Sequence, residues 1–439
     1  MSVLMLAQTD GLAAESSLAS AQSMSSLLAA YWPLLPAAFV VSLLATPLVR
    51  SLAFRIDAID RPDIARKEHK KPVAYMGGLA VFAGLIVAIS LSYVLAPDVP
   101  ANFVSVPLAI IIGMVAVTFT GLADDLWGWD PRLKIAGQLV AAAALAVEEV
   151  GTKVAAGIIV PIAQMFDESL NAAGLVFQMS TPMGVVSFDL VYWVGIAIIA
   201  IFVLGGCNSA NLIDGLDGLL SGVTAIIAIG LLVISLLMVT TGAIESVANP
   251  EAESLAGARI VICLAVAGAV LGFLPYNFNP ATIFLGDCGS LLLGYCSIVV
   301  ILMLGDEGKT HLVVCGLIVF SIPIVDTVFA IVRRKLSGVS MSSADNQHLH
   351  HKLLRHFGSV KKAVLSLYGM GIGFAVFGAG LAWLVLETSY RVRHLYVVSL
   401  LFYIGMILVA FWLSRRQPAM AKKNESPANE GTKSGSTSS

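Results

Sequence analysis

Apolar stretches of about 20 residues recur along this chain, from near residue 30 to near residue 414. A helix needs about 20 consecutive apolar residues to cross the hydrocarbon core of a bilayer, which is about 30 Å thick. Of the 439 residues, 58% are hydrophobic and only 12% are charged, whereas a soluble domain carries about 25% charged residues. The sequence therefore excludes a single large soluble core and predicts an all-α, polytopic membrane protein.

The hydrophobic pattern divides the chain into three parts. An N-terminal segment, 1–29, precedes the membrane domain, 30–416. A polar tail, 417–439, follows and is expected to be disordered. About eleven spans are expected in the membrane domain, and the connection at about 151–189 is expected to hold a small β-hairpin. The expected spans are 30–51, 76–96, 104–122, 132–150, 190–208, 217–240, 258–276, 282–304, 312–332, 364–386 and 395–414.

Basic residues are distributed unevenly between the two sets of connecting loops. If the N-terminus lies outside, one set of loops and span ends holds 21 Lys and Arg residues and the other holds 5, which together make the 26 in the chain. Loops rich in Lys and Arg stay in the cytoplasm. We therefore expect an outer N-terminus, a cytoplasmic C-terminus, and an active site at the cytoplasmic face, where the polar motifs of the chain gather.

The first of these motifs is a pair of adjacent carboxylates, Asp124 and Asp125, at the end of an apolar run. Charged residues are costly to place in a membrane segment, so they indicate a functional site. Two adjacent carboxylates suit a metal ion, a general base, or both. The alternative is that one of them caps a helix at the membrane surface, a position that aspartate favours.

A basic loop forms the second motif, and it runs through Lys70 into the pair Gly77-Gly78. Free backbone N–H groups at the start of a helix suit a phosphate, and a lysine supplies a point charge for the same group. The alternative is a plain basic anchor for the next span.

The third motif runs from Asn211 through two Asp-Gly steps, which contain Asp214, Gly215 and Asp217. Such turns present backbone groups and carboxylates together. The segment lacks the ligand spacing and the closing glutamate of an EF-hand, so it is not a calcium loop of that type. The alternative is an ordinary turn between two helices.

Asp287 is the centre of the fourth motif and lies inside the expected span 282–304, between Gly286 and Gly289. Small neighbours allow another backbone to approach closely. An ionised carboxylate in this place needs a cation, and Mg²⁺, or alternatively Mn²⁺, is the natural choice for oxygen ligands beside a phosphate. The alternative is a purely structural aspartate.

Three clustered histidines, His348, His350 and His351, follow the expected span 312–332, just after Asp345. They support a zinc site only weakly, because the cluster has neither a cysteine nor a histidine pair at i, i+4. Imidazoles beside Arg and Lys suit an anionic ligand, since both kinds of group donate hydrogen bonds. The alternative is a solvated loop.

Taken together and in order, these motifs resemble the polyprenyl-phosphate N-acetylhexosamine-1-phosphate transferase family, glycosyltransferase family 4. The resemblance covers residues from about 60 to about 355. Within the family, His-Leu-His-His looks like the bacterial branch that makes undecaprenyl-linked GlcNAc for O-antigen, common antigen or teichoic acid. The peptidoglycan branch usually has three consecutive histidines followed by Phe-Glu. The matching motifs are Gly77-Gly78, Asp124-Asp125, Asn211-x-x-Asp214-Gly215-x-Asp217-Gly218, Phe284-x-Gly286-Asp287-x-Gly289-Ser290 and Asp345-x-x-His348-Leu349-His350-His351.

The resemblance implies a Mg²⁺-dependent enzyme of the bacterial plasma membrane. It would transfer a HexNAc-1-phosphate, with GlcNAc-1-phosphate as the expected group, from a UDP-sugar to undecaprenyl phosphate and release UMP. This reaction initiates a cell-envelope polysaccharide. The expected partners are therefore UDP-N-acetylhexosamine and undecaprenyl phosphate, no nucleic acid is expected, and a homodimer stays open. The alternative within the family is the phospho-MurNAc-pentapeptide transferase of peptidoglycan synthesis.

The resemblance also implies roles for individual residues. Asp287 and Asn211 would hold the metal ion, and Asp124 or Asp125 would accept or place the proton of the lipid phosphate. Both direct attack by the lipid and an aspartyl-phosphate intermediate have the right chemistry. Because phosphate monoesters have a second pKa of about 6, little base is needed, which favours direct attack. The expected substrate-binding residues are Lys70, Lys134, Asp214, Gly215, Asp217, Phe284, His348, His350 and His351.

An ion-coupled transporter is the main rival from another class of protein. A transporter also places carboxylates in its spans and breaks helices with glycine, but near the middle of the membrane. Here nearly all the charges lie at one end of the spans, where a soluble nucleotide and a lipid headgroup can meet. A purely structural membrane protein would leave the polar motifs without a role.

Overall fold

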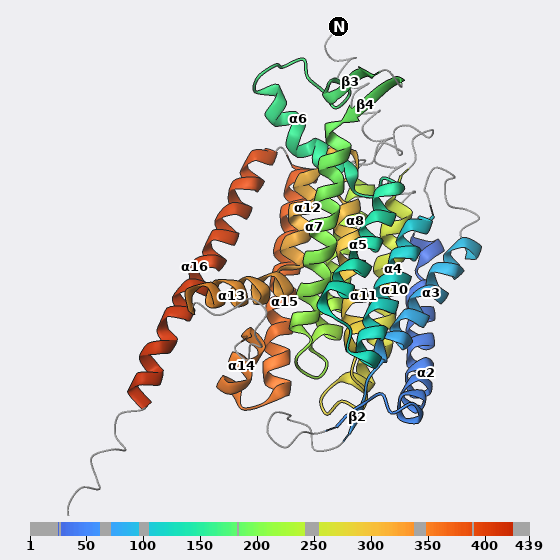
Figure 1. Ribbon diagram of the computed structural model, residues 1–439, viewed down its shortest axis with the longest axis vertical. Coiled ribbons are helices and arrows are strands. Elements are labelled where there is room, and N and C mark those ends of the chain that lie inside the picture. The colour runs from blue at the N-terminus through green and yellow to red at the C-terminus, as the bar shows by residue number, and fades with distance from the viewer. Residues whose placement is uncertain are drawn as a thin grey trace, which may run out of the picture.

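The protein is described from a computed structural model, in which residues 25, 28–61, 72–95, 105–181, 184–241, 254–337, 348–388 and 390–424 are placed. Most of the helices run side by side with roughly parallel axes (Figure 1). Their bounds are α2 Leu34–Arg55, α3 Gly77–Leu95, α4 Leu108–Trp127, α5 Pro131–Val147, α6 Ala156–Gln164, α7 Leu190–Ile213, α8 Leu219–Thr240, α10 Ala256–Asn277, α11 Gly286–Met303, α12 Thr310–Val319, α13 Ser321–Ser337, α14 Leu349–Phe357, α15 Val360–Glu387 and α16 Val392–Asn424.

Nine helices in the described part of the chain are long and apolar enough to cross a membrane, and the pair α12–α13 makes a tenth if it counts as one broken span. This confirms a helical, polytopic membrane protein. The eleventh expected span, 132–150, is α5, whose 17 residues are at the lower limit for a crossing. It runs the length of α11, with Lys134 beside Asp287 at one end and Gly151, just after α5, against Leu302 at the other. Which end of the bundle faces the cytoplasm stays a prediction.

The expected single span 312–332 is wrong in its shape. The chain forms α12 and α13 there, and their axes are bent by 78°, so that α13 lies across the other helices (Figure 1). Pro323 explains the break. A proline inside a helix removes one hydrogen bond, and its ring collides with the carbonyl four residues earlier, which here belongs to Val319, the last residue of α12.

Helix α11 lies at the centre of the bundle. The apolar part of α11 is 94% buried and that of α10 is 89% buried, against 22% for the outer helix α15. Glycines let neighbouring backbones approach α11 closely, as is common where membrane helices pack. A Cβ at Gly121 of α4 would collide with the backbone of Asp287, and one at Gly78 of α3 would collide with that of Gly289. The start of α11 is therefore enclosed by α3 and α4.

The turn between α4 and α5 is built from residues suited to helix ends. Gly128 adopts a positive φ of 62° directly after α4, a conformation that glycine accepts without strain. The Asp130 carboxylate then accepts a hydrogen bond from the backbone nitrogen of Arg132 and caps α5, with Pro131 in the first turn. This turn returns Lys134 toward the end of α4, where Asp124 lies.

Two small antiparallel sheets complete the fold. The strands β1 (Ile59–Asp60) and β2 (Val73–Ala74) pair beside the start of α3. The strands β3 (Val176–Thr181) and β4 (Gly184–Asp189) form the hairpin expected within 151–189, with the short helices η1 (Thr152–Ala155) and η2 (Ala173–Leu175) before it. A third short helix, η3 (Asp306–Gly308), joins α11 to α12.

The termini bear on the expected division of the chain. The segment 1–29 lies almost wholly outside the described residues. Helix α16 continues to Asn424 and so enters the tail that was expected to be disordered from residue 417. The division into three parts stays a prediction.

Candidate active site

Asp125 holds the first turn of α11 in place. Its carboxylate accepts hydrogen bonds from the backbone nitrogens of Asp287 at 2.8 Å and of Cys288 at 3.1 Å. Gly286 lies just before them with a φ of 75°, and a Cβ there would press on the Asp125 carboxylate. The cap weighed as an alternative for the aspartate pair therefore exists, but Asp125 caps another helix, α11, and not its own.

Asp124, the other member of the pair, faces a lysine. The Lys134 ammonium lies 2.6 Å from an oxygen of Asp124 and 2.6 Å from an oxygen of Asp287. The three side chains keep between 17% and 24% of their surface exposed, so a ligand in solution can reach them. Two carboxylates and one ammonium thus meet at the end of the bundle where α4 ends and α11 begins, which we call the site end.

Asn211 joins this cluster from the last turn of α7. Its amide nitrogen donates to Asp287 at 2.7 Å and to the Ser290 hydroxyl at 2.9 Å. Four elements, α4, α5, α7 and α11, therefore contribute polar side chains to the cluster. The structure brings together Asp124, Asp125, Lys134, Asn211 and Asp287, as the sequence predicts.

The turn after α7 contains Asp214, Gly215 and Asp217. The Asp217 carboxylate accepts hydrogen bonds from the Asn279 side chain and from the backbone nitrogen of Ala281, both at 2.9 Å. It therefore shapes the segment before α11. Burial, reinforced by the negative charges around it, raises the pKa of Asp214 to about 8, so its carboxyl is largely protonated at neutral pH when no cation is near.

The histidine segment is organised by Asp326 of α13. This carboxylate, which is 1% exposed, lies 2.7 Å from the His348 ring and accepts from the backbone nitrogen of Leu349 at 2.6 Å. His350 is also buried and packs against Gly215, since a Cβ at that glycine would collide with its ring. Burial lowers the pKa of His350 to about 3, so the imidazole is neutral.

The predicted role of Gly77 and Gly78 is not supported. Their backbone nitrogens donate to the carbonyl oxygens of Phe284 at 2.9 Å and of Leu285 at 2.8 Å, so neither N–H group is free for a phosphate. The pair instead fastens the start of α3 to the segment before α11. The Phe284 ring lies 5.9 Å from that of Tyr75 and is partly exposed beside it.

Two further predicted residues lie outside the described part of the chain. Lys70 belongs to the basic loop at 62–71, and Asp345 belongs to the segment 338–347. Their roles stay predictions.

Comparison with known proteins agrees with this geometry. The model of glycosyl transferase family 4 matches residues 107–305. A probable undecaprenyl-phosphate N-acetylglucosaminyl 1-phosphate transferase of Bacillus subtilis (strain 168) is 32% identical over 348 residues, which cover 77% of this chain and 82% of the relative. This chain belongs to glycosyl transferase family 4.

Other members of glycosyl transferase family 4 resemble the chain to a similar degree. A decaprenyl-phosphate N-acetylglucosaminephosphotransferase of Mycolicibacterium smegmatis is 33% identical over 368 residues, 78% of this chain and 79% of the relative. A phospho-N-acetylmuramoyl-pentapeptide-transferase of Bacillus cytotoxicus is 30% identical over 354 residues, 78% of this chain and 94% of the relative. Identity alone therefore separates the two branches only slightly.

The donor atoms of this family 4 site suit a divalent cation that is shared with a phosphate substrate. Within the described ranges, no three His, Cys, Asp or Glu side chains converge as a protein-only metal site would require. Mg²⁺ is commonly held by one or two carboxylates together with substrate phosphates and water. Asp287 and Asp124 offer those carboxylates, and a half-turn of the Asn211 amide would offer its oxygen beside Asp287.

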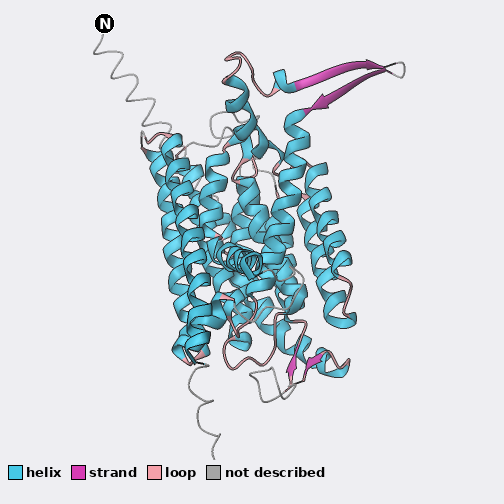
Figure 2. Cartoon of the chain, turned by 60° about the vertical axis from the view of Figure 1, so that its left-hand side comes forward, coloured by secondary structure: helices cyan, strands magenta, loops and turns pink. Residues whose placement is uncertain are grey.

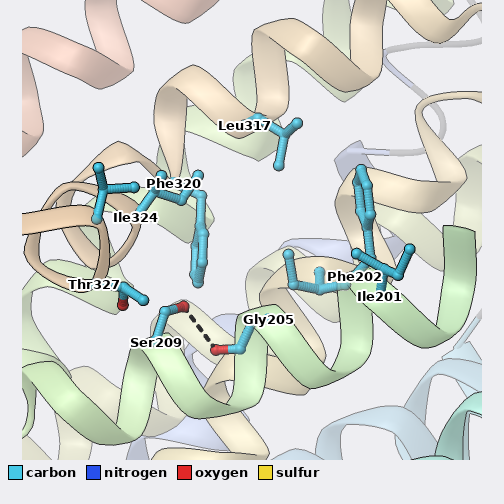
Figure 3. Close-up of a pocket in the computed structure, with 11 residues that line it drawn as sticks. Ile201, Phe202, Gly205, Ser209, Leu317, Phe320, Ile324 and Thr327 are labelled. Atoms are coloured by element: carbon cyan, nitrogen blue, oxygen red, sulfur yellow. Dashed lines mark hydrogen bonds between the residues drawn. The ribbon is translucent and has the colours of Figure 1, made fainter. Parts of the chain in front are cut away.

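An apolar cavity of about 210 Å³ lies between α7, α11 and the break of α12 and α13. Figure 3 shows Phe202 and Ile201 on one side of it, and Leu317, Phe320 and Ile324 on the other. Ser209 lines it too and precedes Asn211 by two residues on α7. The cavity therefore approaches the polar cluster along one helix.

Sequence reasoning assigned no role to several residues that shape the site. Ser290 accepts from Asn211, Asn279 donates to Asp217, and Tyr75 lies beside Phe284. Asp326 lies inside the expected span 312–332, and its partners His348 and Leu349 were not predicted from the sequence. Asn279 could have been found from the run Asn277-Phe278-Asn279-Pro280, because asparagine and proline together indicate a turn.

Proposed function

We propose that this protein transfers GlcNAc-1-phosphate from UDP-GlcNAc to undecaprenyl phosphate and releases UMP. The product would be the first lipid-linked sugar of a cell-envelope polysaccharide. The relatives from Bacillus subtilis and Mycolicibacterium smegmatis, whose names describe N-acetylglucosamine phosphate transfer to a polyprenyl phosphate, support the reaction.

The observation that carries this proposal is the Lys134 ammonium between the carboxylates of Asp124 and Asp287. Two anions must meet in the reaction, so their mutual repulsion is the main obstacle. A site that pairs positive charge with oxygen ligands lowers this repulsion by positioning and by electrostatic stabilisation, which supply most of the catalysis in phosphoryl transfer.

In the proposed step, an oxygen of the lipid phosphate attacks the sugar-linked phosphorus of the nucleotide sugar. A new P–O bond to the lipid phosphate forms, and the P–O bond to the bridging oxygen breaks. The electron pair of that bond leaves with UMP. A phosphate monoester is largely dianionic at neutral pH, since its second pKa is about 6, so the attacking oxygen needs little help from a base.

The geometry supports different roles for the two adjacent aspartates. Both oxygens of Asp125 accept backbone N–H groups of α11, so we assign it to positioning. Asp124 faces Lys134 at the partly exposed surface of the cluster, so we assign it the contact with the lipid phosphate and any residual proton. An aspartyl-phosphate on Asp125 is disfavoured, because its oxygens are engaged.

Asp287 and Asn211, with Asp124 beside them, would hold Mg²⁺, for which Mn²⁺ could substitute. When bound, the ion supplies a Lewis acid that neutralises charge on the diphosphate. Lys134 would pair with a phosphate oxygen of the substrate, since lysine acts as a point charge toward phosphate. Lys70 of the basic loop is proposed to do the same.

The two substrates would approach the cluster from different sides. The Asp214–Asp217 turn and Phe284 are proposed to bind the uridine, and His348, His350 and His351 the sugar-phosphate end. His350 supports the turn from beneath, because its buried ring packs on Gly215. The cavity between α7 and the α12–α13 break is proposed to take part of the prenyl chain, since its lining is mostly apolar.

The site end is proposed to face the cytoplasm of a bacterial plasma membrane. The set of loops and span ends that the sequence assigns to this side holds 21 of the 26 basic residues, which supports this orientation. The position of Asp287 in the first turn of α11 also argues against an ion-coupled transporter, whose site would lie near the middle of the membrane.

The test is a transfer assay with purified protein, undecaprenyl phosphate and radiolabelled UDP-GlcNAc, with Mg²⁺ or with EDTA. The proposal expects label in the lipid fraction, equimolar UMP, and loss of both with EDTA. Transfer from UDP-MurNAc-pentapeptide but not from UDP-GlcNAc would move the protein to the peptidoglycan branch. Absence of transfer from any UDP-HexNAc by folded protein would contradict the proposed function.

A further inference from the structure

The β3–β4 hairpin has one apolar and one polar face near its base. Phe177 and Phe188 are directly opposite each other in the register, and opposite residues of an antiparallel pair share a face. The next pair, Gln178 and Ser187, lies on the other face, because successive side chains alternate. Near the base of the hairpin, the two aromatic side chains therefore lie on one face and the two polar side chains on the other.

The aromatic face is largely open in the described part of the chain. Phe177 is 57% exposed and Phe188 is 45% exposed. The strands β3 and β4 pair only with each other. An isolated two-stranded hairpin is marginally stable at best in water, so this face is expected to rest against something apolar.

The aromatic face is continuous with the outer surface of α7. The Phe188 ring stacks on that of Trp193 in the first turn of α7, with an interplanar angle of 8° and centroids 6.1 Å apart. Trp193 is 52% exposed, and Ile201, about two turns further along the same helix, is 67% exposed. Since α7 is a membrane span, this strip of exposed apolar side chains faces lipid and leads directly to the hairpin.

The hairpin face is too small to bind a second copy of the chain by itself. Each strand has six residues, so the face measures roughly 20 Å by 10 Å, on the order of 200 Å². A stable protein–protein interface buries about 800 Å² on each partner. Lipid sets no such minimum, and aromatic rings are favoured at the boundary between hydrocarbon and water.

We propose that the Phe177–Phe188 face of the hairpin lies against the lipid interface and anchors the adjacent start of α7. The hairpin projects sideways from the end of the bundle, with its strands steeply inclined to the helix axes (Figure 2). It can therefore lie along a membrane surface with its polar face toward water. The anchored helix is the one that carries Asn211 at its other end.

A neighbouring element has the same character. Helix α6 packs on α7 through a small apolar cluster that includes Ile159 and Val160. Just beyond its end, Met165 and Phe166 are 83% and 87% exposed. Helix α6 lies at the same end of the bundle as the hairpin (Figure 1), as a second point of contact with the interface would require.

The test uses nitroxide labels on single introduced cysteines in full-length protein, held in phosphatidylcholine–phosphatidylglycerol nanodiscs. Phe177→Cys and Phe188→Cys report on the aromatic face, and Gln178→Cys and Ser187→Cys on the polar face. Val376→Cys, at an exposed position on the outer helix α15, gives the value for lipid. All five native cysteines are buried, so the unsubstituted protein serves as the labelling blank. Relaxation by oxygen, which partitions into lipid, is compared with relaxation by a water-soluble nickel chelate.

The proposal expects a severalfold higher oxygen-to-nickel ratio at 177 and 188 than at 178 and 187, approaching the value at 376. A low ratio at all four positions would place the hairpin in water and overturn the proposal. Protection from both reagents at 177 and 188 would indicate a protein contact and would also overturn it. Using two positions on each face keeps the result independent of any one variant that folds poorly.

Discussion

The carboxylate of Asp125 lies 2.8 Å from the backbone nitrogen of Asp287, while the side chain of Asp287 turns to Lys134 and Asn211. Asp125 therefore acts on the backbone of Asp287 and sets where its side chain points. Its neighbour Asp124 reaches the same cluster through Lys134. Two adjacent and chemically identical residues thus have separable tasks.

Substitution of each aspartate by asparagine should separate these tasks. Asp124→Asn keeps the shape but removes a charge near the reacting groups, so kcat should fall by about 10²–10⁴ with the melting temperature unchanged. Asp125→Asn can keep only one of two acceptors for α11 and should cost about 1–3 kcal/mol of stability. Thermal unfolding in detergent and steady-state kinetics measure both effects. Equal losses of stability in the two variants would contradict the assignment.

Lys134→Met should lower the rate about 10²–10³-fold, because the charge that offsets two carboxylates and a phosphate is removed from a preorganised site. Lys134→Arg retains the charge but changes its geometry, so it should recover part of this loss. Arg132→Met, on the exposed side of the same turn, is the matched control and should leave kcat within a factor of about two, since exposed charges contribute little. A wild-type rate in Lys134→Met would mean that the lysine has no part in the proposed chemistry.

Removal of divalent metal should abolish transfer. Activity should return with Mg²⁺ and, to some extent, with Mn²⁺, because both accept oxygen ligands. Asp287→Asn should lose activity at any practical Mg²⁺ concentration while the protein remains folded. The binding of UMP and Mg²⁺ should raise the melting temperature of the wild type, by mass action, and not that of Asp287→Asn. Normal turnover by that variant would eliminate Asp287 as a metal ligand.

Asp217 and Asn279 should act as one unit. Asp217→Ala removes an acceptor from Asn279 and from the backbone of Ala281, so the segment before α11 should loosen and KM for the nucleotide sugar should rise. Asn279→Ala should have a smaller effect in the same direction. The double variant should be less impaired than the sum of the two, with a coupling of about 0.5–3 kcal/mol. Additive effects would indicate that Asp217 binds substrate independently.

His350 should make stability depend on pH. Burial lowers its pKa from the ordinary 6.5 to about 3, so between these values the unfolded chain binds a proton that the folded protein does not. Stability is then complete above about pH 6.5 and falls as the pH is lowered, by about 2 kcal/mol at pH 5. The melting temperature of His350→Gln should therefore fall less between pH 7.5 and pH 5 than that of the wild type. The melting temperature of His356→Gln, at an exposed position on α14, should fall as much as that of the wild type.

The sequence predicted the membrane architecture well, because each span is long and apolar by itself. It predicted the members of the polar cluster for a related reason: Asp124, Asp125 and Asp287 are costly at the ends of membrane segments unless they have a role. Asp287 lies in the first turn of α11, somewhat nearer the helix start than the sequence places it, because Gly286 begins the helix.

The errors arose where a local pattern had two structural outcomes. A glycine pair at the start of a helix can offer its N–H groups to a ligand or to another part of the chain, and only the packing of α3 on the segment before α11 decides between them. Pro323 within an apolar run can kink a span or break it. Here Pro323 breaks the span after Val319, and the two helices meet at a bend of 78°, an angle that the sequence pattern does not contain.

Pairing between distant residues also could not be predicted from the sequence. Asp326 lies 23 residues before Leu349, and Asp217 lies 64 residues before Ala281. Each carboxylate is an ordinary polar residue until the fold supplies its donors. The different roles of Asp124 and Asp125 could not be predicted for the same reason. The two residues are identical in type and adjacent in the sequence, and only the fold shows which one contacts the backbone of α11.

The most direct test of the proposed phosphoryl transfer is the fate of ³²P placed at the sugar-linked phosphorus of UDP-GlcNAc. Purified protein is incubated with this donor, undecaprenyl phosphate and Mg²⁺, and the lipid and aqueous products are separated. We predict that ³²P enters the lipid in a one-to-one ratio with the sugar and that the released nucleotide is unlabelled UMP. Sugar in the lipid with ³²P remaining in UDP would mean that the sugar alone is transferred, and it would contradict the proposed reaction.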